Sequence, residues 1–265
     1  MAMTTTSKAV GTSHVAIEEV VALCRRLRLK YVREQLEEVV LTARAQRWDP
    51  AEMLRTLLTA EAEGRDRATV EVKRRRARLP TGKTFDTWDP ARSSIPDKTQ
   101  RALRSLEWIS RCENLVVAGP QGLGKSHLLE ALANMAVDEG LTVAWFSIED
   151  LGGLVRRHRV DDSVAKAFST LANVSFTVVD DIGLMPISAD ATEGLYRLVD
   201  AAYERRSVAI SSNIHPGGFD QLMDKTIASA LVDRLLQHAH VIVVEGESVR
   251  LADATSGKGV VPLAS

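Results

Sequence analysis

The sequence predicts an α/β protein with a mostly parallel sheet, preceded by a small all-helical segment. From residue 97 onward, short apolar stretches alternate with amphipathic stretches of helical length, which is typical of a parallel sheet covered by helices on both faces. One of the apolar strands runs into a glycine-rich loop and a helix, and before residue 80 the apolar residues recur only with helical spacing. These observations define the fold class and divide the chain in two.

The composition is that of an ordinary globular protein with one or two domains. The chain has 265 residues, of which 45% are hydrophobic and 26% are charged. No apolar run approaches the roughly 20 residues of a membrane span, and the first residues lack the apolar core of a secretory signal. Cys24 and Cys112 form neither a disulfide framework nor a metal motif. We therefore expect a cytoplasmic protein.

The net charge of −1 conceals an asymmetry along the chain. Residues 1–80 contain 16 Lys and Arg against 11 Asp and Glu, whereas the remainder has a net charge of −6. A basic first part on an acidic body indicates that contact with a polyanion such as DNA begins in the first part.

Three helices are expected in the first part of the chain. Asp49 is a natural N-cap for the third helix, Pro50 suits its first position, and Glu52 completes a capping box. The expected helices cover Ile17–Leu29, Tyr31–Gln46 and a segment from Pro50 to about Leu79.

The second part alternates helices and strands after a turn-rich segment. The expected helices cover Asp97–Cys112, Lys125–Asp138, a pair across Ile148–Leu171, Ala191–Arg205 and Thr226–His238. The expected strands are Leu115–Ala118, Thr142–Ser147, Phe176–Val179, Val208–Ser211 and Val241–Val244. The expected domains are a disordered tail at 1–16, a helical domain for DNA binding or assembly at 17–79, a linker at 80–96, the α/β domain at 97–254 and a disordered tail at 255–265.

The glycine-rich loop matches the phosphate-binding motif G-x-x-x-x-G-K-[ST] between a strand and a helix, as the motif requires. Its backbone N–H groups are expected to form an anion nest at the positive end of the helix. Lys125 would then reach the β- and γ-phosphates, and Ser126 would ligate Mg²⁺. The sequence thus predicts binding of a nucleoside triphosphate by Gly119, Pro120, Gln121, Gly122, Leu123, Gly124, Lys125, Ser126 and His127.

Polar residues at the ends of two later strands are candidates for the hydrolytic chemistry. Asp180 is placed to hold Mg²⁺ together with Ser126, and Asp181 to polarise the attacking water. Asn213 could bind the γ-phosphate or the water, because ligands lie beyond the carboxyl ends of parallel strands. It could equally begin the turn that follows.

The roles of an arginine and two histidines near the end of the chain stay open. Arg234 lies off the apolar face of its helix. It is either an ordinary surface residue or an arginine finger for the γ-phosphate in a neighbouring subunit. His238 and His240 lack a third ligand for a metal, so we interpret them as structural.

Two basic clusters are candidates for contact with DNA phosphates, although solvated helix surfaces would have the same composition. No aromatic residues are interleaved with the first cluster, which disfavours stacking on single-stranded bases. Binding is expected to be largely independent of DNA sequence and weakened by salt. The residues are Lys73, Arg74, Arg75, Arg76 and Arg78 in the first cluster and Arg156 and Arg157 in the second.

The chain resembles the AAA+ ATPases and, among them, the IstB-like transposition helpers, which are related to the DnaC helicase loaders. The resemblance is carried by the stretches GPQGLGKSHL, VVDDIGLMPIS, YERRSVAISSN and ALVDRLLQHAHVIVVEGESVRL, and it extends upstream through RRRARLPTGKTFDTWD to cover roughly residues 17–252.

This resemblance implies a P-loop AAA+ domain of three layers, with a five-stranded parallel sheet in the order 5-1-4-3-2. It assigns Asn213 to the sensor-1 role and Arg234 to the finger role, and Arg250 is a candidate for sensor 2. It also implies Mg²⁺-dependent ATP hydrolysis, assembly of the protein with itself on duplex DNA and a transposase partner. The second carboxylate, Asp181, is often Glu in such proteins, so slow hydrolysis is expected.

Three other functions fit part of the sequence. A helicase loader would use the same motifs but prefer single-stranded DNA and a helicase partner. A small-molecule kinase on a P-loop scaffold would need no arginine from a neighbouring subunit, and it leaves the basic helical segment unexplained. A DNA-binding protein with a vestigial nucleotide site is disfavoured because Lys125, Ser126 and Asp180 are all present.

Overall fold

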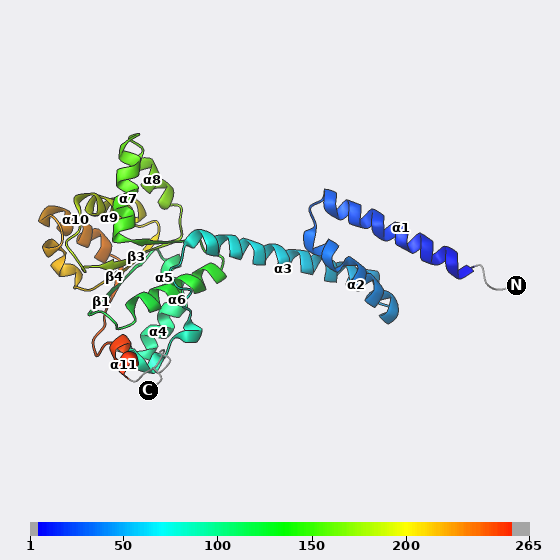
Figure 1. The fold of residues 1–265 in the computed structure, drawn as a ribbon, viewed down its shortest axis with the longest axis horizontal. Helices are drawn as coiled ribbons and strands as arrows, with labels where there is room; N and C mark the ends of the chain where they lie inside the picture. Colours follow the sequence, from blue (N-terminus) through cyan, green and yellow to red (C-terminus); the bar gives the residue numbers. More distant parts are fainter. Residues whose placement is uncertain (1–4, 256–265) are drawn as a thin grey trace, which may run out of the picture. The chain divides into compact units, whose positions relative to one another are not determined.

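The computed structural model describes residues 5–255, with side chains described from residue 16 onward except at Asp253 and Ala254. The chain divides into two compact units, Met1–Glu71 and Val72–Ser265 (Figure 1). The helix α3 (Pro50–Ala77) contributes to both. Among the described helices, none is both long and apolar enough to cross a membrane.

The first unit is helical, as expected. It contains α1 (Thr5–Arg26), α2 (Lys30–Gln46) and about the first six turns of α3. Its core is a small cluster of Cys24, Val32, Leu36, Val39 and Leu57. The buried carboxylate of Glu61 on α3 accepts hydrogen bonds from the N–H groups of Tyr31 (2.8 Å) and Val32 (3.0 Å) at the start of α2. These bonds satisfy free donors at a helix N-terminus and join α2 to α3.

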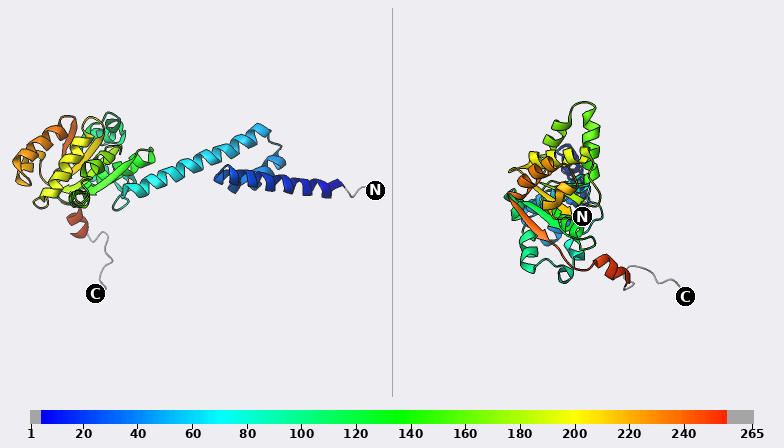
Figure 2. Two further views of the ribbon diagram at one scale, coloured as in Figure 1. Left: turned by 90° about the horizontal axis from the view of Figure 1, so that it is seen from above. Right: turned by 90° about the vertical axis from the view of Figure 1, so that its left-hand side faces the viewer.

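The second unit, seen from two further sides in Figure 2, is built on a parallel sheet. The strand order is β2-β3-β4-β1-β5, which confirms the predicted order. The strands are β1 (Asn114–Ala118), β2 (Val143–Ser147), β3 (Phe176–Ile182), β4 (Ser207–Ser212) and β5 (Ala239–Val243). The strands β1 and β4 are buried along their whole length, which explains the run of apolar residues at the centre of each.

Helices cover both faces of this sheet. One core cluster joins β1, β3 and β4 to four helices, α7 (Ile148–Arg159), α8 (Val164–Leu171), α9 (Ala189–Ala202) and α10 (Lys225–Leu236). Within β1, Val116 belongs to this cluster, while Leu115 and Val117 point to the other face because side chains alternate along a strand. That other face is covered by α6 (Lys125–Asp138), which contacts β2, β3 and β4.

Several boundaries differ from those predicted. The helix α1 begins at Thr5, so residues 5–16 of the expected tail are helical, and residues 1–4 and 256–265 of the expected tails lie outside the described residues. The single helix expected over Asp97–Cys112 is two helices, α4 (Asp97–Arg104) and α5 (Glu107–Ser110). Between them Leu106 has a left-handed φ of 57°, and the buried indole of Trp108 donates to the Leu103 carbonyl (3.0 Å). The chain thus turns at Leu106, immediately before the buried indole.

The segment expected as a linker, residues 80–96, contains the 3₁₀ turns η1 (Phe85–Thr87) and η2 (Pro90–Arg92) and packs on α6. Its Trp88 indole donates to Gln100 (2.8 Å) and meets the His127 ring edge to face at 5.2 Å. Two further elements, η3 (Pro216–Gln221) and α11 (Val249–Thr255), were not expected. Residues 80–96 therefore form part of the second unit instead of separating two domains.

Candidate nucleotide-binding site

The loop between β1 and α6 has the backbone shape of a phosphate-binding loop. Gly119, Gly122 and Gly124 have φ values of 147°, 81° and 82°, which favour glycine. A Cβ atom at Gly119 would lie 2.2 Å from the carbonyl oxygen of Val244, and one at Gly122 would lie 2.1 Å from Ser248 Oγ. The loop is therefore closely packed against the segment that follows β5, and its glycines are required by both conformation and space.

Lys125 is a buried cation at the centre of this loop. Only 5% of the residue is exposed, and its Nζ donates to the carbonyls of Gly119 (2.7 Å) and Pro120 (2.8 Å) and to Asn213 Oδ1 (3.0 Å). Burial lowers the pKa of Lys125, although the carboxylates of Asp181 and Asp180 act in the opposite direction. An ammonium group that is removed from water in this way gains strongly from a nearby phosphate.

The two carboxylates reach the site through a β-bulge. In the pairing of β3 with β4, Val179 faces Ile210 and Ile182 faces Ser212, so Asp180 and Asp181 both face the single residue Ser211. The Ser211 hydroxyl donates to Asp180 Oδ1 and accepts from the N–H of Asp181 (2.9 Å). Asp181 has a φ of 62°, a left-handed conformation that Asp adopts more readily than most residues. The bulge thus lets two successive carboxylates serve the same site.

Asp180 and Ser126 fit the requirements of Mg²⁺. Ser126 Oγ donates to Asp180 Oδ1 at 2.9 Å, and burial raises the pKa of this carboxyl group, opposed by hydrogen bonds from Ser211 and Ser126. A nearby cation would stabilise the ionised form. Within residues 16–252, the structure contains no group of three His, Cys, Asp or Glu residues able to hold a metal. Mg²⁺ commonly uses one or two carboxylates together with the phosphates of its substrate, which suits this pair.

Asn213 lies beyond β4, beside the loop. Its N–H donates to the Ile182 carbonyl (2.8 Å), which joins it to the end of β3, and its Oδ1 accepts from Lys125. Asn213 therefore does more than begin a turn: its side chain is hydrogen-bonded to the loop lysine.

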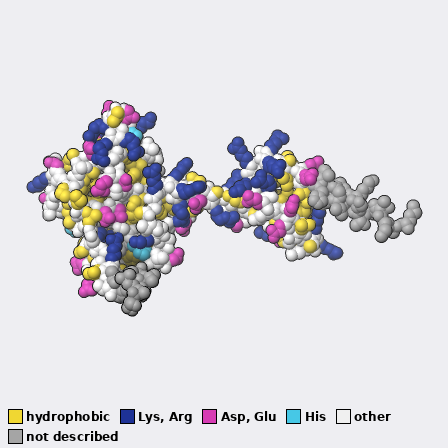
Figure 3. Space-filling model, in the orientation of Figure 1, with side chains coloured by type: hydrophobic (Ala, Val, Ile, Leu, Met, Phe, Trp, Pro, Cys, Tyr) yellow, Lys and Arg dark blue, Asp and Glu magenta, His cyan; other side chains and the backbone are white. Residues whose placement is uncertain are grey.

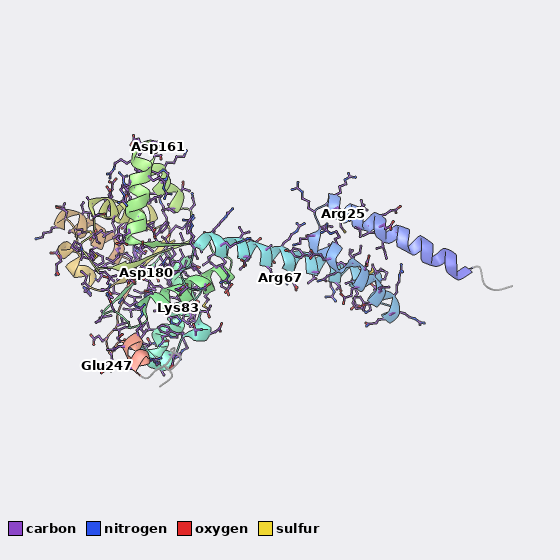
Figure 4. All side chains as sticks on the ribbon, in the orientation of Figure 1. Arg25, Arg67, Lys83, Asp161, Asp180 and Glu247 are labelled. Atoms are coloured by element: carbon purple, nitrogen blue, oxygen red, sulfur yellow. The ribbon has the colours of Figure 1, made fainter. Side chains whose placement is uncertain are left out.

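These residues surround a cavity of about 290 Å³. Its lining includes Gly122, Lys125, Ser126, His127, Asp181 and Asn213, all predicted from the sequence. Asp180 lies behind Ser126, and it is labelled in Figure 4 near the end of β3.

Residues that sequence analysis missed, or named only as candidates, complete the lining. Arg250 lines the cavity from α11, where the N–H of Val249 donates to the Gly122 carbonyl (3.0 Å). Lys83 and Leu184 also line it, and neither was predicted. Lys83 belongs to residues 80–96, where Phe85 and Trp88 were an available signal, because large aromatic side chains are unusual in a solvated linker.

Arg234 is not among the residues that line this cavity. It lies on α10, about one third exposed, where its guanidinium donates to Tyr196 Oη (2.6 Å) and pairs with Asp200 (3.3 Å). His240 pairs with Glu113 (2.7 Å) and His238 lies 3.8 Å from Glu204, in keeping with structural roles.

The two predicted basic clusters are only partly available to an external ligand. Lys73 donates to the Gly140 carbonyl, and Arg74 binds Asn134 and Asp138 of α6. In the second cluster, Arg156 lies 3.5 Å from Asp190. Figure 3 shows basic side chains gathered around α7 and α8, the helices that project from the second unit.

The remaining cations include two that share a groove. Arg78 and Arg157, 79 positions apart, line a groove of about 380 Å³ beside the half-buried Trp145 of β2. Across residues 16–252, neither guanidinium group forms an ion pair or a hydrogen bond. Asp150 also lines the groove, but its carboxylate is occupied in capping α7 through Ser147. The tertiary structure thus supplies an aromatic residue that is not near the cluster in the sequence.

The sheet order, the phosphate loop, the paired carboxylates and the asparagine beyond β4 together define an ATP-binding protein of the AAA+ class. The chain belongs to the family described as IstB-like ATP binding protein, whose model matches residues 22–256.

Curated relatives match over nearly their full length. The chain is 28% identical over 239 residues to the insertion sequence IS21 putative ATP-binding protein of Pseudomonas aeruginosa, covering 89% of this chain and 90% of the relative. It is 27% identical to the insertion sequence IS5376 putative ATP-binding protein of Geobacillus stearothermophilus, covering 89% and 95%.

Solved structures share the fold at lower identity. AMPPCP-bound DnaA from Aquifex aeolicus aligns with a TM-score of 0.51 at 18% identity, covering 69% of this chain and 58% of that one. The crystal structure of DnaI aligns with a TM-score of 0.51 at 17% identity, covering 65% and 94%.

Proposed function

We propose that this protein is an ATP-dependent switch that assembles with copies of itself on duplex DNA and regulates a transposase. ATP bound at the phosphate loop promotes assembly, and Mg²⁺-dependent hydrolysis disassembles it. ATP is then the only molecule that is chemically altered, and the presence of its γ-phosphate determines how long the assembly persists.

The residues around the cavity support ATP hydrolysis. Lys125 and the loop N–H groups would neutralise the phosphates, and Ser126 and Asp180 would hold a metal ion that supplies further positive charge. Asp181 accepts a proton from the attacking water, and Asn213 orients that water or the γ-phosphate. Because Asp181 is one methylene shorter than Glu, water is held less closely, and we propose slow hydrolysis.

The observation that carries the assembly proposal is the position of Arg234. Its guanidinium lies outside the lining of its own cavity and is held by Tyr196 and Asp200. A surface arginine that is already oriented by neighbouring side chains is suited to act on the γ-phosphate bound by another subunit. The nucleotide would then lie between Lys125 of one copy and Arg234 of the next.

The cations of both clusters are proposed to contact DNA, and Arg78 and Arg157 are proposed to make the main contacts. These two guanidinium groups share one groove, so they can bind phosphates of the same strand. The other cations would contribute mainly to the positive electrostatic potential around the groove. They are Arg75, Arg76 and the paired Lys73, Arg74 and Arg156. Such contacts carry no sequence information.

A transposase is proposed as the partner because the curated relatives are named for insertion sequences. The likeness to DnaA and DnaI reflects the fold alone at this identity, and it does not favour a role in replication.

Light-scattering mass of the purified protein tests the proposal. It is measured with and without duplex DNA, in the absence of nucleotide, with ADP and with a non-hydrolysable ATP analogue. A large assembly that requires both DNA and the analogue is the expected result, and a mass that stays monomeric in every condition would overturn the switch.

A mixing experiment tests the arginine finger separately. Arg234→Ala and Lys125→Ala chains are each expected to be inactive, but a mixture forms some interfaces with an intact Lys125 on one side and an intact Arg234 on the other. Recovery of ATP hydrolysis on mixing is expected. Arg197→Ala, which removes an arginine paired with Glu193 on α9, is the matched control and should leave hydrolysis unchanged.

A further inference from the structure

Lys83 is a cation at the nucleotide cavity that the mechanism above does not use. It lies in the segment between α3 and η1 and lines the cavity together with Lys125 and His127. Within residues 16–252, its ammonium group makes no hydrogen bond or ion pair. In Figure 4 it is labelled in the second unit close to α6.

The backbone around Lys83 is held by a buried carboxylate on α6. Glu130 is only 2% exposed and accepts three hydrogen bonds: from the N–H of Thr81 (2.7 Å), from the Thr81 hydroxyl (2.6 Å) and from the N–H of Gly82 (2.5 Å). One turn further along α6, Asn134 is 3% exposed and donates to the carbonyl oxygen of Lys83 itself (2.8 Å). The residues on one side of Lys83 and its own carbonyl are therefore fixed to this helix.

Burying Glu130 is unfavourable unless its oxygens are satisfied, and here all three donors belong to the successive residues Thr81 and Gly82. The helix that carries Glu130 begins at Lys125, directly after the phosphate loop. The helix α6 therefore holds Lys83 at a fixed position relative to the phosphate loop. A buried carboxylate devoted to holding two successive residues indicates that the position of the following side chain matters.

The neighbours of Lys83 indicate which phosphates it faces. Asn213, which accepts a hydrogen bond from Lys125, and Asp181, whose charge opposes the lowering of the Lys125 pKa by burial, mark the γ-phosphate end. Lys83 instead neighbours His127, which follows Ser126 in the first turn of α6 and lies 3.3 Å from the Thr84 carbonyl. The positive charge of Lys83 also contributes to lowering the pKa of His127, after burial, which is the main cause. Lys83 is therefore at the end of the cavity away from the γ-phosphate.

We propose that Lys83 binds the α- and β-phosphates of the bound nucleotide and that Glu130 is the positioning residue that holds it there. The proposal rests on the cavity being the ATP site. It follows that Lys83 contributes equally to ATP and ADP affinity, whereas Asn213 distinguishes the two.

The test is the dissociation constant of the full-length protein for fluorescent ATP and ADP in the presence of Mg²⁺. A charge-assisted hydrogen bond to phosphate predicts about tenfold weaker binding of both nucleotides by Lys83→Ala. Lys83→Arg should recover most of the loss, and Asn213→Ala should weaken ATP binding only. The melting temperature without nucleotide should not change in Lys83→Ala.

A double-mutant cycle tests the role of Glu130. If Glu130 acts through Lys83, Glu130→Gln weakens binding in the wild-type background but has no further effect in Lys83→Ala. Thr81→Val, which removes only one of the three donors, provides a milder variant if Glu130→Gln does not fold. Additive effects of Glu130→Gln and Lys83→Ala would overturn the positioning role.

The outcomes separate this inference from the assignment of the site. Unchanged affinity in Lys83→Ala, or a loss confined to ATP, overturns the role of Lys83 while leaving the ATP site intact. A wild-type protein that binds neither nucleotide would overturn the ATP site itself, and this inference with it.

Discussion

The phosphate loop and the two basic clusters all contain cations of the second unit, but these cations differ in their bonding partners. In the loop, Lys125 is buried and all three of its donors have acceptors that belong to the site. In the clusters, Arg74 and Arg156 are paired with carboxylates of the same unit, whereas Arg78 and Arg157 are not. The comparison teaches that a run of basic residues in a sequence predicts charge but does not predict which cations are available to a ligand.

The largest effect is expected in the loop. Lys125→Ala removes the ammonium group that neutralises charge on the transferred phosphate, and ATP hydrolysis should fall by about 100-fold or more. Steady-state phosphate release measures this loss.

The melting temperature of Lys125→Ala provides the control. Because burial already disfavours the charged lysine, the variant without nucleotide should be about as stable as the wild type. Hydrolysis within a few-fold of wild type would contradict the assignment of the loop.

A smaller effect is expected where the cations are free. Arg78→Ala combined with Arg157→Ala should weaken duplex DNA binding and lower the slope of log affinity against log salt by about 2, since each lost phosphate contact lowers it by about 1. Fluorescence anisotropy over a salt series measures both quantities. The matched control is Arg74→Ala combined with Arg156→Ala. Equal losses of DNA affinity in the two double variants would contradict the distinction between free and paired cations.

Trp145 allows a further test of the groove, because it lies there with both free arginines. Trp145→Ala should weaken binding of single-stranded DNA by up to about tenfold if bases stack on the indole, and that of duplex DNA by less. Competition between the two forms of DNA measures the ratio, and Trp145→Phe should retain most of the effect. Equal losses for both forms would show that the indole acts only as packing.

For the paired cations the expected effect is on stability. Arg74→Ala breaks contacts with Asn134 and Asp138, and because the pair is partly exposed it should lower the free energy of unfolding by only about 1 kcal/mol. Urea unfolding measures this change. A variant of undiminished stability that binds DNA poorly would show that Arg74 contacts DNA after all.

The smallest effect is expected at Glu113, a surface carboxylate outside both regions. Hydrogen bonds from Arg111 and His240 lower the pKa of Glu113 from 4.5 to about 2. Since its pKa is depressed in the folded state, its stabilising contribution is present above about pH 4.5 and is lost as the pH falls toward 2. The free energy of unfolding of the wild type, measured by urea unfolding, should exceed that of Glu113→Gln by about 1 kcal/mol at pH 6 and by less at pH 3. A difference independent of pH would contradict this account.

Much of the site was predictable because its signals are local. The phosphate loop is contiguous, and its glycines, lysine and serine act through backbone geometry that the next helix completes. Asp180 and Asp181 follow an apolar strand, and parallel strands bring their carboxyl ends to one edge of a sheet, which also brings Asn213 beside Lys125. The strand order came from the resemblance to a known family.

The sequence by itself therefore determined the fold class, the nucleotide-binding loop and the residues that follow its strands, because each depends on neighbours along the chain. Only the tertiary structure decided that residues 80–96 pack on α6, that Lys83 and Arg250 line the cavity and that Arg78 and Arg157 share a groove. These groups meet across separations of tens of residues. Whether a surface cation meets a carboxylate or solvent depends on how helices pack, and the spacing of charges in a sequence does not record that.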